Sequence, residues 1–401
     1  MRMIIYIARN FLAIAFLFLF FQSGFTQEEK EPKLQVSGYI KYLTSYNVTT
    51  LKTPFLSYDT TLADNFIHNR LNLKYFATPK LTFSLEARNR IFYGERVRAT
   101  PGFADQIDQY NGLADLSVRW LETESAFIHS IIDRAYIDYT SGKWNVRVGR
   151  QRINWGINLV WNPNDLFNAL NFLDFDYEER PGSDAIRVQY YPGALSTAEI
   201  AFAPADSIEQ SVGAALYKFN VKGYDVQVLA GYYRGDLALG TGWAGNIGGM
   251  GLKGEATFFT PLEPSSDTVN SLGISATGDY LFGNGLYLSG AFLYNSQGKN
   301  SDIASALTNL NSTSNISSKN LFPAEWAFVT SLSGNINPLL AVNGSVIYSP
   351  GNHLTAIVPT VTYSIKENWD IDLVGQTFLM ELFDSYQHLS TSVFLRLKWS
   401  Y

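Results

Sequence analysis

The chain has 401 residues, contains no cysteine and carries a formal net charge of −6 at neutral pH. The absence of cysteine excludes disulfides and thiolate metal sites, and the acidic balance argues against nucleic acid as a partner. Aromatic residues make up 15% of the chain and charged residues only 16%, which is typical of a β protein whose outer surface faces lipid.

The first predicted element is a secretory signal peptide over residues 1–26. Arg2 and Arg9 flank the apolar run FLAIAFLFLFF (residues 11–21), which is too short for a transmembrane helix. Small residues follow at the positions that a signal peptidase prefers. A membrane anchor is the alternative, and the acidic QEEKEPK that follows, without a stop-transfer pattern, argues against it. Residues 27–33 are predicted to form a short periplasmic segment.

From residue 34 to residue 401, apolar and polar residues alternate with period two, and no stretch reaches the length of an apolar transmembrane helix. The alternation recurs at 34–42, 67–75, 81–91, 135–139, 144–148, 186–190, 198–202, 215–221, 226–232, 272–282, 286–294, 326–332, 340–348, 354–358, 369–375 and 392–401. Strands with aromatic ends, repeated along a secreted chain, predict a transmembrane antiparallel β-barrel in the cell outer membrane.

The chain ends on a sharply alternating segment, SVFLRLKWSY (residues 392–401). This segment resembles the terminal strand by which outer-membrane barrels are recognised by the barrel assembly machinery. The alternative, an edge strand of a soluble β-sandwich, is disfavoured by the signal peptide and by the number of similar strands. The assembly machinery and the lipids of the outer membrane are therefore predicted partners.

The number of strands depends on residues 235–269. Short turns alternate with longer loops along the chain, and if both termini are periplasmic the strands number about sixteen, with 235–269 as one extracellular excursion. However, GLKGEATFF (residues 251–259) alternates well. If it is a strand, a second unrecognised strand must restore an even number and give eighteen. Either number predicts a water-filled lumen.

The inward faces follow by elimination from the apolar outward faces. Five successive strands place cations inward, with two carboxylates among them, and the candidate pore-lining residues are Arg70, Lys74, Glu86, Arg88, Arg90, Arg134, Asp138, Arg147 and Arg187. This pattern predicts a basic wall that attracts anions or polar oxygens. The alternative is that these side chains pair with one another only to tolerate burial.

Alternation stops after residue 152, and residues 153–183 form a long segment rich in aromatic and acidic residues. Such a segment is too apolar to be disordered, so we expect it to fold inward as a constriction or plug loop. Its candidate residues are Trp155, Trp161, Asn162, Asp165, Asp174 and Asp176, with Asn162-Pro163-Asn164 and Pro181-Gly182 as fixed turns. A loop lying over the barrel mouth is the alternative.

Arg150 and Arg152 precede this segment and share the alternation of the outward-facing Val146 and Val148. Lipid would not tolerate them there. A glycine inside a strand often marks a bulge, so we predict that a bulge at Gly149 turns both arginines into the pore. The alternative is that the strand has already left the membrane there and the arginines cap the rim.

Three stretches carry a resemblance to a known family: DRAYIDYTSGKWNVRVGRQRINWG, NPNDLF and ERPGSDAIRVQYYPG, all within residues 130–195. They resemble Gram-negative outer-membrane proteins of the alginate-export and DUF1302 porin-like kind. The resemblance implies an outer-membrane barrel with a transport or diffusion role. The net-acidic composition departs from the alginate exporters, so a polyuronate substrate is not implied.

The expected function is a porin-like channel for small hydrophilic solutes, anionic or sugar-like, that uses no metal and no cofactor. One alternative is a non-conducting structural or envelope-assembly barrel. Another is an outer-membrane enzyme, but the four histidines, His68, His129, His353 and His388, fall in no catalytic motif and at no metal-ligand spacing. The oligomeric state is left open.

Overall fold

The computed structural model describes residues 33–52, 57–108, 112–169, 176, 182–263, 269–298, 316–351, 353–382 and 385–401. The predicted signal peptide, residues 1–26, lies outside the described residues, and the region from Gln35 to Tyr401 forms one compact unit. None of the helices within these ranges is long and apolar enough to cross a membrane.

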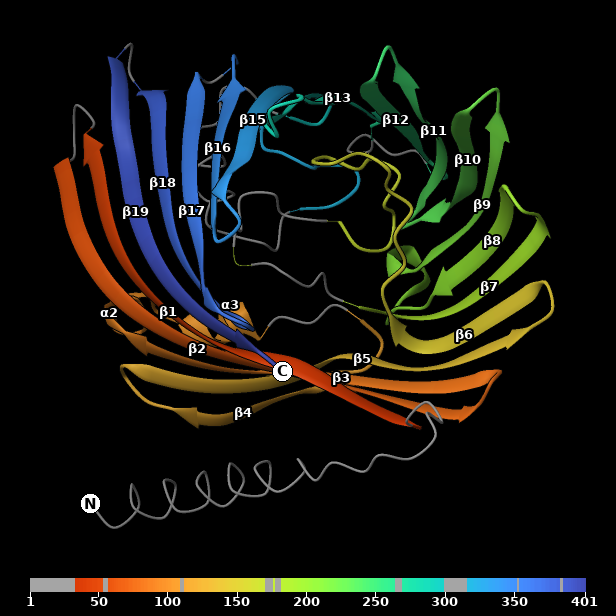
Figure 1. The fold of residues 1–401 in the computed structure, drawn as a ribbon, viewed down its shortest axis with the longest axis horizontal. Coiled ribbons are helices and arrows are strands. Elements are labelled where there is room, and N and C mark those ends of the chain that lie inside the picture. The colour runs from red at the N-terminus through yellow and green to blue at the C-terminus, as the bar shows by residue number, and fades with distance from the viewer. Residues whose placement is uncertain are drawn as a thin grey trace. The chain divides into compact units, whose positions relative to one another are not determined.

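The described strands form one antiparallel sheet that closes on itself, because β1 pairs with both β2 and β19 (Figure 1). The first half contains β1 (Leu34–Lys52), β2 (Ser57–Thr78), β3 (Leu81–Gly94), β4 (Ser117–Glu122), β5 (Ala126–Ser141), β6 (Trp144–Gln151), β7 (Ser183–Gly193), β8 (Ser196–Ala203) and β9 (Val212–Val221). The second half contains β10 (Tyr224–Tyr233), β11 (Asp236–Ile247), β12 (Met250–Pro261), β13 (Ser271–Leu281), β14 (Tyr287–Asn295), β15 (Trp326–Asn337), β16 (Leu340–Ser349), β17 (Leu354–Lys366), β18 (Trp369–Leu382) and β19 (Ser385–Ser400).

Eighteen of these strands form the closed ring, and β4 stands outside it. One edge of β5 pairs with β3, whereas the other edge pairs with β6 from Ala135 onward and with β4 over Phe127–Ile131. The short strand β4 thus prolongs the line of β6 beyond the point where β6 ends. The helices α2 (Glu95–Ala99) and α3 (Phe103–Ile107) lie in the same connection, and η1 (Ile208–Gln210) lies between β8 and β9.

The prediction of sixteen strands was wrong, and the eighteen that were held open are confirmed. Residues 251–259 belong to β12, and β11 is the second strand that an even number required. Residues 235–269 are therefore mostly barrel wall and not an extracellular excursion. The sequence of β11, DLALGTGWAGNI, has glycine and alanine at many positions, which weakens the alternation of large apolar residues by which strands are recognised.

The burial pattern separates an inner from an outer face. In β1, Lys41 and Leu43 are buried while Ile40 and Tyr42 are exposed, as alternation predicted. Exposed aromatic side chains gather at both ends of the wall: Tyr139 and Trp144 flank one short turn, and Trp326, Tyr348 and Tyr386 lie toward the other end. Two such girdles on an apolar outer surface are typical of a barrel that spans a membrane.

The predicted bulge at Gly149 was wrong. The ladders that join β6 to β5 and to β7 run through Gly149 without a register shift. The register shift lies instead on β5, where Glu86 opposes Arg134 and Ala87 opposes Ile132, so that Asp133 is the extra residue. Gly149 has another role, because its φ is +117° and a Cβ there would lie 2.3 Å from the carbonyl oxygen of Ala135.

We therefore expect Gly149→Ala to destabilise the barrel by about 1–3 kcal/mol, since a left-handed backbone and a close approach both oppose a side chain. The measurement is urea unfolding of the detergent-solubilised protein. Gly344→Ala is the matched control, because Gly344 also lies within a strand and an added Cβ would meet no atom within 4 Å. Equal stability of the two variants would contradict this account.

Candidate functional site

Cationic residues line the inner face of five neighbouring strands of the ring, β2, β3, β5, β6 and β7. Ladder pairs place Arg70 opposite Arg88 and Arg147 opposite Arg187. Like charges that face each other across a ladder repel, so this basic wall needs anions between its members. The basic wall is defined here as Arg70, Lys74, Arg88, Arg90, Arg134, Arg147 and Arg187.

Asp133 supplies one of these anions. Its two carboxylate oxygens accept hydrogen bonds from Arg70 Nη1 at 2.7 Å and from Arg88 Nη2 at 2.8 Å. Arg70, which is 1% exposed, also donates to Glu86 at 2.5 Å and to Asn72 at 2.9 Å. The bulge on β5 turns Asp133 inward beside Arg134. Without Asp133, two guanidinium groups would lie largely buried and less well compensated, an arrangement that costs about 3–5 kcal/mol.

Asp138 holds the part of the basic wall that β6 and β7 contribute. Its carboxylate accepts from Arg147 Nε at 2.6 Å and from Asn145 at 2.7 Å, and the Arg147 guanidinium stacks on Tyr136 at 4.4 Å from the ring centroid. Arg187 donates to Asn145 at 3.1 Å. This part of the wall therefore contains two arginines and one carboxylate, and it retains a positive charge.

A cavity of about 280 Å³ lies against the basic wall, lined by Gln35, Ser37, Asn72, Lys74, Glu86, Arg134 and Arg152. Within the described residues, no carboxylate pairs with Lys74 or Arg152, and Arg152 Nε is buried without a hydrogen-bond partner. Arg152 thus lines one cavity with Arg134 and Lys74, although no bulge at Gly149 brings it there.

Arg150 occupies a different environment. By strand alternation Arg150 would face outward like Val148, yet its side chain is buried. Its Nε donates a hydrogen bond to Asp184 on β7 at 2.8 Å. Its Nη1 donates to the carbonyl oxygen of Ile132 at 3.1 Å, and its Nη2 donates to that of Ala114. Arg150 therefore bridges the end of β6 and the segment that leads into β4, and none of these contacts points into the cavity of Arg152.

The described part of the predicted constriction loop, residues 153–169, is here called the luminal segment. Ile153, Trp155 and Leu166 pack against inward residues of β7–β12, such as Ala201 and Phe259. Val160 and Trp161 pack against inward residues of β14–β19, such as Leu293 and Ile347. Trp155 and Trp161 are each 1% exposed. The segment therefore crosses from one side of the ring to the other inside the lumen (Figure 1).

Glu255 on β12 is the main polar anchor of the luminal segment. Its side chain is fully buried, and its carboxylate accepts hydrogen bonds from the backbone N–H groups of Ile157, Asn158 and Asn164. The distances for Asn158 and Asn164 are 2.8 and 3.0 Å. A carboxylate that accepts several backbone N–H groups fixes a loop that has no regular structure of its own.

Side chains of the wall complete the anchoring. Trp155 Nε1 donates to Glu199 at 2.7 Å, Gln227 donates to the Trp155 carbonyl oxygen at 2.8 Å, and Asn164 accepts from Thr257 at 2.7 Å. The predicted turn at Asn162-Pro163-Asn164 is confirmed, because the Asp165 N–H donates to the Asn162 carbonyl oxygen at 3.1 Å.

Two acidic residues of the predicted loop, Asp165 and Asp176, lie within the described residues. Asp176 pairs with Lys41 on β1 at 2.7 Å and with Arg396 on β19 at 3.1 Å, next to the seam that closes the ring. Asp165 is buried, and its carbonyl oxygen accepts from Ser318 at 2.7 Å. Asp174 and Pro181 lie outside the described residues.

Ser318 belongs to a second inserted segment, residues 316–324 between β14 and β15, which was not predicted from the sequence. Leu321, Phe322 and Ala324 are buried in the same cluster as Trp161, and the Trp161 and Phe322 rings meet edge to face at 5.9 Å. Lys319 pairs with Asp236 on β11 at 2.6 Å. The two inserted segments therefore support each other inside the lumen.

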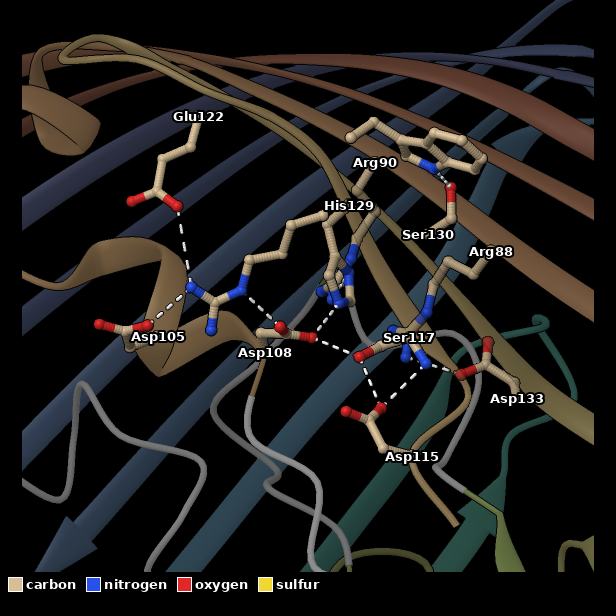
Figure 2. A network of polar contacts seen from close by, with 12 residues as sticks. Arg88, Arg90, Asp105, Asp108, Asp115, Ser117, Glu122, His129, Ser130 and Asp133 are labelled. Carbon is tan, nitrogen blue, oxygen red and sulfur yellow. Dashed lines mark hydrogen bonds and ion pairs between the residues drawn. The ribbon is translucent and has the colours of Figure 1, made fainter.

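The connection between β3 and β5 forms a third luminal structure, centred on Asp108 (Figure 2). Arg90 Nη2 donates to His129 Nδ1 at 2.9 Å, because a guanidinium can only donate. His129 Nε2 then carries the proton and donates to Asp108 at 2.7 Å. Asp108 also accepts from Ser117 at 2.6 Å and from Arg119 at 2.5 Å.

The cations of the basic wall were named from the sequence, but several of the groups that hold them in place were not. By the alternation of the second half of β5, the Asp133 side chain would point outward. Only the bulge on β5 turns it inward. Glu255 and the inward Lys41 sit at alternating positions of their strands, so alternation alone could have indicated them once the strands were recognised. The described residues contain no group of His, Asp and Glu that could hold a metal ion.

Replacing Glu255 tests the anchoring of the luminal segment. We expect Glu255→Ala to leave three backbone N–H groups without their acceptor, at about 1–3 kcal/mol for each buried donor. Amide hydrogen exchange at residues 157–164 should accelerate by at least about tenfold, since 1.4 kcal/mol is tenfold in an equilibrium. Glu255→Gln retains one acceptor oxygen and should show a smaller increase. Unchanged exchange in Glu255→Ala would refute the anchor.

The Asp108 network predicts a response to acid. Burial raises the pKa of Asp108, but hydrogen bonds from Ser117, Arg119 and His129 outweigh burial and hold the pKa below its usual value. A lowered pKa in the folded state contributes stability above the ordinary pKa of about 3.9, and that stability is lost as the pH falls through the folded value.

We therefore expect hydrogen exchange in residues 95–116 to accelerate below about pH 4 in the native protein. Asp108→Asn should show fast exchange already at neutral pH, with a weaker acid transition. Asp105→Asn is the control, because Asp105 is exposed and, among the described residues, its ion pair is with Arg119 alone. A transition of equal size in native protein and Asp108→Asn would contradict the assignment.

Solved structures with a similar fold include proteins of Acinetobacter baumannii and Pseudomonas aeruginosa. OccAB3 of Acinetobacter baumannii matches with a TM-score of 0.58 and 10% identity over 92% of this chain and 99% of that one. The outer membrane protein opdK from Pseudomonas aeruginosa matches with a TM-score of 0.54 and 9% identity over 92% and 98%. No family model and no curated protein matches the chain. At these identities the likeness establishes the fold, a closed antiparallel β-barrel of the kind found in these proteins.

Proposed function

We propose that this protein is a porin-like channel of the cell outer membrane that passes small hydrophilic solutes. The observation that carries the proposal is a closed ring of eighteen strands with an apolar outer face and a polar, charged inner face. A ring of this size is too wide for its own wall side chains to fill, so a water-filled interior is expected.

The contacts inside the barrel support a narrowed passage. The luminal segment is anchored by two apolar clusters and by Glu255, and this anchoring supports a constriction inside the lumen over an outward loop. A constriction must be rigid to select solutes. In this proposal Trp155, Trp161, Asn162, Asp165 and Asp176 fix the course of the constriction, and the residues around Arg134 and Arg152 line the remaining space.

The charge of the lumen favours anions or polar oxygens. Lys74 and Arg152 face the cavity against the basic wall without a described carboxylate partner, and guanidinium groups bind oxygen atoms in pairs through their fork of N–H donors. The proposal includes outer-membrane lipids and the barrel assembly machinery as partners. The resemblance of residues 130–195 to alginate-export and DUF1302-type proteins stays a prediction, and we assign no polyuronate substrate.

Close packing in the lumen also favours a second candidate, a structural or envelope-assembly barrel that conducts nothing. Trp161 joins the luminal segment to Phe322 of the second inserted segment, and the two together could occlude the passage. Conductance separates the two candidates, because both predict the same fold.

We expect purified protein to form anion-preferring single channels in planar bilayers. Deletion of residues 160–178 should raise the conductance, because it removes the middle of the constriction, and Arg152→Gln should reduce anion preference without changing channel size. A Gly344→Ala barrel is the control for reconstitution. If neither the native protein nor the deletion variant conducts, the channel proposal fails and the structural barrel is favoured.

A further inference from the structure

A second wall of the lumen differs from the basic wall in carrying no charge. The inward positions of β14, β15, β16 and β17, as far as Ser364, include no Lys, Arg, Asp or Glu. These strands lie across the ring from the basic wall (Figure 1). Toward the short turns, their inward side chains are mostly hydroxyls and amides, with one tyrosine and one alanine, Ala341.

The strand register aligns four of these side chains in one row. Tyr287 lies opposite Ser333, Ser333 opposite Asn343, and Asn343 opposite Thr360. Directly opposed Cβ atoms are about 4.5–5.5 Å apart, so the row presents an aromatic ring followed by three hydrogen-bonding groups at regular spacing. We call Tyr287, Ser333, Asn343 and Thr360 the neutral row.

The neutral row lines a cavity of about 370 Å³, to which Asn335 and Thr362 also contribute. Small-molecule sites typically measure about 300–1,000 Å³. Within the described residues, the side chains of Ser333, Asn335 and Thr360 have no hydrogen-bond partner, whereas Thr362 donates to Asp372 at 2.6 Å. Several donors and acceptors in this cavity are therefore available to a solute.

The charges nearest to the row are already paired. On one side Asp279 pairs with Lys253 at 3.3 Å, and on the other Asp372 pairs with Arg396 at 2.9 Å. The Tyr287 hydroxyl also hydrogen-bonds to Asp279. Because both carboxylates already hold a cation, an ion entering this cavity would lose water without meeting an unpaired opposite charge. A neutral solute with many hydroxyl groups would exchange its water for groups that both donate and accept.

We propose that the neutral row is a binding subsite for neutral polyhydroxylated solutes, that is, for sugars in transit through the barrel. The inference rests on the proposed channel function and deepens it. The Tyr287 ring offers an apolar face for a sugar ring, and Ser333, Asn343 and Thr360 bind its hydroxyl groups. The basic wall then binds anionic solutes on the other side of the same lumen.

The test compares glucose with triethylene glycol, a neutral solute without a polyhydroxylated ring. Binding to the detergent-solubilised barrel is measured by saturation-transfer NMR, which needs no conduction, and sugar-induced block is measured in planar bilayers. We expect saturation transfer to glucose but not to the glycol. Ser333→Ala combined with Thr360→Val should weaken glucose binding by about threefold to tenfold for each lost hydrogen bond.

Two further variants make the test specific. Thr277→Val removes an inward hydroxyl on β13, outside the cavity, and should leave glucose binding unchanged. Arg152→Gln should change ion selectivity but not glucose binding. Equal transfer to glucose and glycol, or unchanged glucose binding in the double variant, overturns the subsite. A barrel that binds glucose through the row but never conducts would instead overturn the channel proposal.

Discussion

Closure of the sheet is the constraint on which the rest of this structure depends. A lipid bilayer offers no hydrogen bonds, so every strand edge must be paired within the protein. The seam between β1 and β19 provides this pairing: Gly38 and Tyr401 exchange backbone hydrogen bonds at 3.0 Å in both directions. The Tyr401 hydroxyl also donates to the Arg70 carbonyl oxygen at 3.0 Å. Closure defines an inside and an outside, and it gives each alternating side chain its environment.

Once an eighteen-strand ring is closed, its interior must be stabilised by something other than wall side chains. The protein inserts connections into the lumen and anchors them with buried polar groups. Glu255 holds the luminal segment, Asp108 holds the connection between β3 and β5, and Asp133 separates two arginines that would otherwise repel. Each carboxylate lies where backbone or guanidinium donors converge. A buried donor that has no acceptor costs more free energy than one hydrogen bond contributes.

The finished lumen is asymmetric. On β2–β7 the lumen is lined by cations that outnumber the carboxylates beside them. On β14–β17 it is lined by the neutral row of hydroxyl and amide groups. The luminal segment crosses between these regions and fixes the space that each leaves open. A passage with one charged and one neutral surface can discriminate solutes by charge and by hydroxyl content, and this asymmetry connects the proposed channel with the proposed sugar subsite.

The sequence by itself determined the barrel, the direction of each recognised strand face and the cations of the basic wall, because the two-residue repeat of a strand is a local property. It also indicated that strand alternation ends after residue 152, where the luminal segment begins. Only the tertiary structure decided the ring of eighteen, since glycine-rich β11 takes its place by pairing with β10 and β12. The bulge at Asp133, the anchor at Glu255 and the row from Tyr287 to Thr360 depend on register between strands, a non-local property that no single strand encodes.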